Sequence, residues 1–220
     1  MRLPSLSAHF SASVRAGNYV ARRLRRAKLT LLADDAALVT SGGRVTMRAR
    51  DDADMPIQDG LADRDAADDL LDETAQDARA SLAGRSASAV KEEPYTLIFP
   101  SGSAYYTAAP LDQELKRYTE LSERLTKYLP DADPVRVAAV PVIGVGIADF
   151  SAATATLAQA RTGEAMAATD LSAAVDAWRA QMEKTYGALV AQMGKAKAER
   201  FFPREREKRV KANKAPDQPG

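Results

Sequence analysis

Apolar residues recur at steps of three, four or seven positions along several stretches of the chain, and this spacing places them on one face of an α-helix. The two clearest ladders run from Leu111 to Leu129 and from Leu171 to Leu189. Their members are Leu111, Leu115, Tyr118, Leu125 and Leu129 in the first, and Leu171, Val175, Trp178, Met182 and Leu189 in the second. The pattern predicts two long amphipathic helices and places Trp178 in a helical core.

The first part of the chain follows the same rule. Its ladder predicts a helix from about residue 5 to residue 40, which glycines in Ser41-Gly42-Gly43 would end. The expected inward residues are Phe10, Val14, Val20, Leu24, Ala27, Leu31 and Leu38. A β-hairpin over residues 38–50 is an alternative, because Val45, Met47 and Ala49 alternate with polar residues.

Further helices are expected at 60–83, at 111–129 and at 147–201. Residues 95–110 carry two prolines and four aromatic side chains, which predicts a loop packed onto the bundle, with a short strand at 96–99 as an option. The run 135–147 contains Pro141 and two glycines, so it is expected to be a buried connector. Gly163 is the expected site of a kink or break in the last helix.

These elements predict an all-α fold, an elongated antiparallel bundle of about four long helices. The bundle domain is expected to span residues 5–202, and residues 203–220 are expected to form a disordered charged tail. Alanine supplies 44 of the 220 residues. Because alanine buries little area, such a core is thin and favours elongated bundles or oligomers.

Charge divides the chain into blocks that the overall net charge of +1 conceals. Residues 51–77 hold eleven acids and one base, whereas residues 15–28 hold six bases and no acid. Residues 195–214 hold nine bases and three acids. Long helices with such segregated charge are able to select one another, or another charged partner.

Two charged groups are the candidate binding surfaces. The basic one, the candidate for partner binding, consists of Arg22, Arg23, Arg25, Arg26 and Lys28. The acidic one consists of Asp65, Asp68, Asp69 and Asp72, whose spacing puts them on one helical face that we expect to be solvated. Pairing of the bases with acids, within the chain or between copies, is favoured over contact with nucleic acid.

Residue types needed for chemistry are scarce. The chain has no cysteine and one histidine, His9, which excludes thiolate chemistry and a Glu-x-x-His metal site. Gly144 and Gly146 begin a glycine-rich phosphate-loop pattern, but Asp149 stands where the third glycine belongs. Glu183 or Asp176, beside Trp178, is the only acid–base option considered, and nothing supports it. We therefore expect no catalytic residue, no metal and no cofactor.

Together these features predict a non-enzymatic helical-bundle protein, an adaptor or assembly subunit that works through a protein partner or self-association. The alternative is a nucleic-acid-associated protein that binds the phosphate backbone through basic helix segments. The longest apolar run, 137–148, is twelve residues long and interrupted, whereas a membrane span needs about 20. We accordingly expect a soluble, cytoplasmic protein without a membrane span.

Overall fold

The computed structural model describes residues 1, 3–5 and 9–203, and within them the secondary structure is entirely helical. The long helices are α1 (Ser11–Arg26), α2 (Thr30–Asp52), α3 (Met55–Ala83), α6 (Glu114–Tyr128) and α7 (Pro134–Met193). The short ones are η1 (Ala89–Lys91), α4 (Tyr95–Ile98), α5 (Ala104–Thr107), α8 (Lys195–Ala198) and η2 (Glu199–Phe201). The all-α prediction is confirmed.

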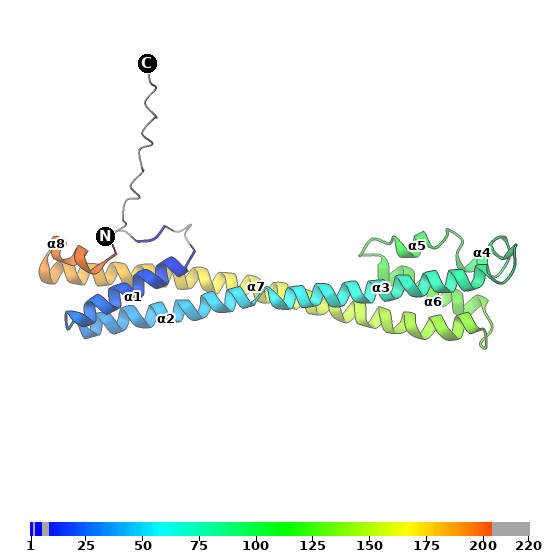
Figure 1. Cartoon of the computed structure of the whole chain (residues 1–220), viewed down its shortest axis with the longest axis horizontal. Helices are drawn as coiled ribbons and strands as arrows, with labels where there is room; N and C mark the ends of the chain where they lie inside the picture. The colour runs from blue at the N-terminus through cyan, green and yellow to red at the C-terminus, as the bar shows by residue number, and fades with distance from the viewer. Residues whose placement is uncertain (2, 6–8, 204–220) are drawn as a thin grey trace, which may run out of the picture. The chain divides into compact units, whose positions relative to one another are not determined.

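The chain divides into two compact units, and α7 contributes to both (Figure 1). The first unit comprises residues 1–51 and the chain from Ala167 onward, and the second comprises Asp52–Met166. The predicted bundle of four long helices is therefore replaced by two helical units, each with its own core.

In the first unit, α1 and α2 form an antiparallel hairpin that packs on the second half of α7 (Figure 1). The turn between α1 and α2 includes Lys28, which has a positive φ of 61°. Trp178 of α7 is fully buried, and its ring meets that of Phe10 edge to face at 6.3 Å. The Trp178 indole N–H donates to the Thr40 hydroxyl at 3.2 Å, so the largest core side chain also has a polar partner.

The hairpin is held closely because small residues line its inner face. The buried residues of α2 are Ala33, Ala36, Thr40 and Gly43. A Cβ added at Gly17 of α1 would lie 2.1 Å from the Thr40 hydroxyl oxygen and 2.8 Å from the Trp178 indole nitrogen. The two helices are thus in contact through atoms that leave no room for a side chain at position 17.

We expect Gly17→Ala to destabilise the protein by about 1–3 kcal/mol, because the added methyl group overfills a packed contact. The matched control is Gly187→Ala, at an exposed position of α7 in the same unit, where an added Cβ meets no atom within 4 Å. That variant should gain up to about 1 kcal/mol from helix propensity. Urea unfolding followed by Trp178 fluorescence measures both, and equal shifts in the same direction would contradict the described packing.

In the second unit, α3, α6 and the first half of α7 surround a core under α4 and α5. Tyr118, Leu121 and Leu125 of α6 are fully buried there, together with Leu71 of α3 and Ile143 of α7. The aromatic segment 95–110 packs down as predicted, but it forms the short helices α4 and α5 instead of a loop or strand. Tyr106 is buried and its hydroxyl donates to the Ile98 carbonyl at 2.9 Å.

Helix α7 starts much earlier than predicted, at Pro134 instead of about residue 147. Asp133 caps its start, since its side chain accepts a hydrogen bond from the Val135 N–H at 2.9 Å, and proline suits the first helical position. Pro141 lies within the helix on an exposed side and does not end it. The helix continues through Gly163 and stops at Gly194, whose φ is 78°.

Three other expectations near the N-terminus are wrong. The predicted 5–40 helix is two helices, because the chain turns back at Ala27–Leu29. Residues 41–43 lie inside α2 instead of ending a helix, and residues 38–50 are helical, so the β-hairpin alternative is not found. Leu31 and Leu38, predicted to face the core, are 83% and 74% exposed.

The remaining boundaries shift less. The predicted 60–83 helix is α3, which starts at Met55, and the predicted 111–129 helix is α6, which starts at Glu114. Leu111 is exposed, whereas Tyr118, Leu125 and Leu129 are buried as predicted. On α7, Trp178, Met182 and Leu189 are buried as predicted. Apart from Pro203, the predicted disordered tail lies outside the described residues.

Candidate interaction surfaces

The outer face of α2 carries three large apolar side chains spaced seven residues apart. Leu31, Leu38 and Val45 are 83%, 74% and 66% exposed. We call these three residues the α2 stripe. Small residues occupy the opposite, buried face of the helix, so the larger apolar side chains are the ones left outside. Apolar residues seven positions apart lie along one line of a helix, which is the spacing of one of the two apolar positions in a heptad.

Charged residues flank the α2 stripe, with acids near its beginning and bases near its end. Asp34 and Asp35 lie near its beginning, and Arg44 and Arg48 lie near its end. Asp34 accepts a hydrogen bond from Arg25 of α1 at 3.1 Å, and this ion pair is largely exposed. An open groove of about 530 Å³ between α1 and α2 adjoins Leu38 and is lined by Asp34, Asp35 and Arg44. The stripe therefore has an acidic end, a basic end and a hollow beside its middle.

The basic residues predicted to bind a partner all lie exposed at the end of α1 or in the following turn. These residues are Arg22, Arg23, Arg25, Arg26 and Lys28. Arg25 pairs with Asp34, and the Arg23 guanidinium lies 6.0 Å from the centre of the Phe201 ring. Among the residues that the structure describes, Arg22, Arg26 and Lys28 have no ion pair. Pairing of these three bases with acids of the chain's other unit or of another copy stays a prediction.

The predicted acidic face of α3 divides into two parts. Asp65 and Asp69 are exposed, and Asp65 pairs with the adjacent Arg64 at 2.6 Å. Asp68 and Asp72, in contrast, are half-buried against α6. Asp72 accepts a short hydrogen bond from the Tyr118 hydroxyl. The expectation of a wholly solvated face is thus wrong for Asp68 and Asp72, because α6 packs over that side of α3.

Glu114, the first residue of α6, completes a buried carboxyl cluster with Asp68 and Asp72. Glu114 is 2% exposed, and one of its carboxyl oxygens, Oε1, has no hydrogen-bond partner. The pKa of Glu114 is raised to about 8, mainly by burial and also by the hydrogen bond with Asp68 and by the charges of Asp68 and Asp72. Burial also raises the pKa of Asp72. The spacing of Asp68 and Asp72 on one helical face can be read from the sequence. No sequence pattern predicts that Glu114 lies beside them.

This cluster lies within the contact between α3 and α6. Glu114 is closed off from solvent, and no group of three acids or histidines that could hold a metal occurs in the described ranges. Two grooves between α3 and α7, of about 700 and 370 Å³, are lined by residues outside this cluster. We therefore assign the cluster a role in the stability of the α3–α6 contact.

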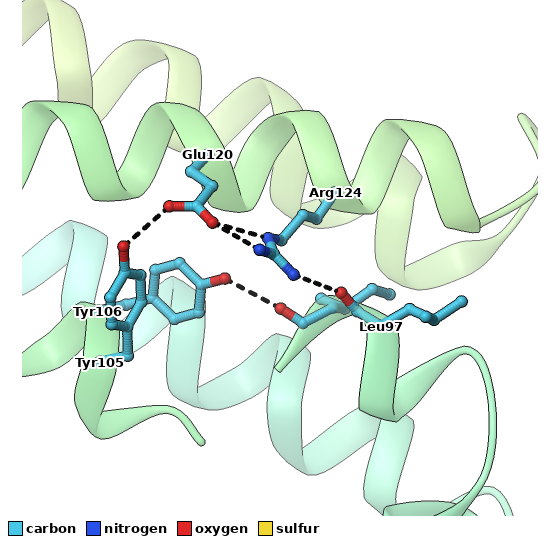
Figure 2. A network of polar contacts seen from close by, with 6 residues as sticks. Leu97, Tyr105, Tyr106, Glu120 and Arg124 are labelled. Carbon is cyan, nitrogen blue, oxygen red and sulfur yellow. Dashed lines mark hydrogen bonds and ion pairs between the residues drawn. The ribbon is translucent and has the colours of Figure 1, made fainter. Parts of the chain in front are cut away.

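A second polar network fastens α4 and α5 to α6 (Figure 2). The Tyr105 hydroxyl donates to Glu120 at 2.9 Å, and Arg124 donates to the same carboxylate at 2.6 Å. Arg124 also donates to the Leu97 carbonyl at 2.7 Å. Burial alone would raise the pKa of Glu120, but the hydrogen bonds from Arg124 and Tyr105 lower it overall. Each polar group points at a partner within the unit, which indicates a structural network.

Helix α7 is the one helix among the described residues that is both long and strongly apolar. It is long and apolar enough to cross a membrane by length and composition, with a window of 18 residues whose mean hydropathy is 1.7 and of which 28% is buried. Val137 and Val145 are more than half exposed, while Ile143 and Phe150 face the core. A core helix of a soluble protein meets the same criterion, and the predicted absence of a span stays a prediction.

Comparison of the chain with protein-family models, with curated proteins and with solved structures finds no match. The feature with the clearest physical consequence is the α2 stripe, because exposed leucines at a regular spacing favour burial against another helix.

Proposed function

We propose that this protein is a non-enzymatic assembly subunit that associates with copies of itself through the outer face of α2. The observation that carries the proposal is the exposure of Leu31, Leu38 and Val45 on one line of a helix whose inner face is made of small residues. Burying one exposed leucine is worth about 1.5–3 kcal/mol, so covering the line provides a driving force for association.

Charge is divided unequally between the two units. The second unit holds 20 acids and 10 bases, a net charge of −10, whereas the rest of the chain has a net charge of +11. The α2 stripe belongs to the positive part, so the proposed association rests on burial of its apolar side chains and not on attraction between unlike units. The proposal extends to a soluble protein, because α7 contributes Val135, Ala139 and Ile143 to the core of the second unit.

The substitution Leu38→Glu tests this proposal. We expect wild-type protein to have a molar mass that is a multiple of 23.6 kDa by light scattering, and the variant to have a mass of 23.6 kDa, because a charge in the middle of the α2 stripe opposes its burial. Leu111→Glu changes an exposed leucine (54%) outside the stripe and should leave the mass unchanged. Wild-type mass in the Leu38→Glu variant, with an unchanged helical spectrum, would exclude this face.

A second function has one observation in its favour. Arg22, Arg26 and Lys28 are exposed and have no ion pair among the described residues, which suits sequence-independent contact with phosphate. The aromatic side chains that stack on single-stranded bases are missing from this group, although Tyr19 is 43% exposed nearby. In the same chromatography, absorbance at two wavelengths detects nucleic acid. Co-elution that disappears at high salt would favour this second function over self-assembly.

A further inference from the structure

We infer that the α2 stripe binds the α2 stripe of a second copy, antiparallel, with Leu38 on the two-fold axis. This inference rests on the proposed self-association and specifies its geometry. It follows from the order of side chains along α2 and does not depend on how the two units are placed.

The spacing of the stripe is the first argument. Leu31 and Val45 lie seven residues before and seven residues after Leu38, so a two-fold axis through Leu38 places Leu31 of one copy opposite Val45 of the other. Gly42, one turn after Leu38, has nothing within 4 Å of an added Cβ and leaves space for the partner's side chain. The surface is therefore self-complementary, as an isologous interface must be.

The charges give the direction. In a parallel pair, Asp34 and Asp35 of both copies would lie at the same level, where like charges repel. In an antiparallel pair about Leu38, Asp34 comes within two residues, about 3 Å along the axis, of the level of the partner's Arg44. Since Arg44 is exposed and long, it can reach that carboxylate, while Arg25 of its own chain binds the other side.

The neighbouring groove supports the same arrangement. The hollow of about 530 Å³ beside Leu38 is lined by Asp34, Asp35 and Arg44 together with apolar atoms of Val14 and Ala37. Both the acids and the base required for the cross-copy ion pairs therefore line a hollow that side chains of a second helix can enter. A helix of about 23 residues is long enough to offer both ends of the stripe at once.

Single cysteines test the geometry directly, because the chain has no cysteine of its own. We expect Leu38→Cys to form a disulfide-linked dimer rapidly under mild oxidation of the full chain. Leu31→Cys and Val45→Cys should each cross-link slowly alone and rapidly when the two variants are mixed, since only mixing places the two cysteines opposite each other. Leu111→Cys is the control for chance collision.

Each result decides between the alternatives. Rapid self-cross-linking of Leu31→Cys and of Val45→Cys would show a parallel pair and overturn this inference, while the proposed self-association would stand. Dimers whose stripe cysteines all cross-link no faster than Leu111→Cys would place the interface elsewhere and also overturn it. A monomeric wild-type protein would overturn both the inference and the proposed function.

Discussion

The Trp178→Asp variant is expected to lose the fold of the first unit. Trp178 is fully buried, its ring contacts Phe10, and its N–H donates to Thr40. Truncation of a buried tryptophan costs about 3–5 kcal/mol, and a buried carboxylate adds a desolvation penalty of several kcal/mol more. Since a domain is stable by only about 5–15 kcal/mol, the combined loss removes most or all of that stability.

The control is Ala177→Asp, which introduces the same side chain one residue earlier at an exposed position of α7. Its helix-propensity cost of about 0.7 kcal/mol is at least as large as that of Trp178→Asp, but it creates no core defect, so it should unfold close to wild type. Circular dichroism in urea and limited proteolysis compare the two variants. A cooperative transition for Trp178→Asp at the wild-type urea midpoint would contradict the assignment of this face of α7 to the core.

The second large effect concerns pH and Glu114. The pKa of Glu114 is raised in the folded protein to about 8, whereas in the unfolded chain the carboxyl has its usual value of 4.5. Between these two values the folded state binds a proton that the unfolded state lacks, so the free energy of unfolding falls as pH rises. The contribution of the protonated carboxyl is complete below about pH 4.5 and is lost by about pH 8.

We expect Glu114→Gln to be more stable than wild type at pH 9 by about 1–3 kcal/mol, the cost of a buried polar group left without compensation. Glutamine keeps the size and a hydrogen-bond donor for Asp68 but cannot ionise. At pH 5 the two proteins should be nearly equal, because wild-type Glu114 is then mostly protonated. The groups that face it from α3 are Asp68, Asp72 and Arg64.

Urea midpoints at pH 5, 7 and 9 measure this effect, with Glu123→Gln as the matched control. Glu123 is an exposed acid on the same helix, so its replacement should leave the pH dependence of wild type intact. Comparison at each pH removes the contributions of other acids, such as Asp133, that both proteins share. A pH profile of Glu114→Gln that is parallel to that of wild type would show that Glu114 does not titrate in this window.

The parts of the fold that the sequence predicts well are the helices with large apolar residues at helical spacing. Trp178, Met182 and Leu189 are buried because large apolar side chains on one face of a helix are stabilised when that face packs against other helices. The same rule failed at Leu31 and Leu38, where the ladder of α1 was extended across residues 27–29. A turn at residues 27–29 reverses the chain, so α2 packs closely on α1. Only small residues such as alanine, threonine and glycine fit on the inner face of α2.

The wrong prediction of a connector at residues 135–147 has a different cause. Proline usually breaks a helix, but Pro141 lies on an exposed side of α7, where water can bind the backbone carbonyl that proline leaves without a partner. The pair Asp133-Pro134 was the better indicator, because an acid followed by proline commonly starts a helix. Glu114 shows the limit of local patterns, since its environment depends on Asp68 and Asp72, more than forty residues away in sequence.

Light scattering of wild-type protein after size-exclusion chromatography, at low and at high salt, tests the central claim most directly. A self-assembling subunit predicts the same multiple of 23.6 kDa at both salt concentrations, with an absorbance ratio free of nucleic acid. A mass of 23.6 kDa in both conditions would contradict self-assembly, as would a complex with nucleic acid that high salt dissociates to monomers.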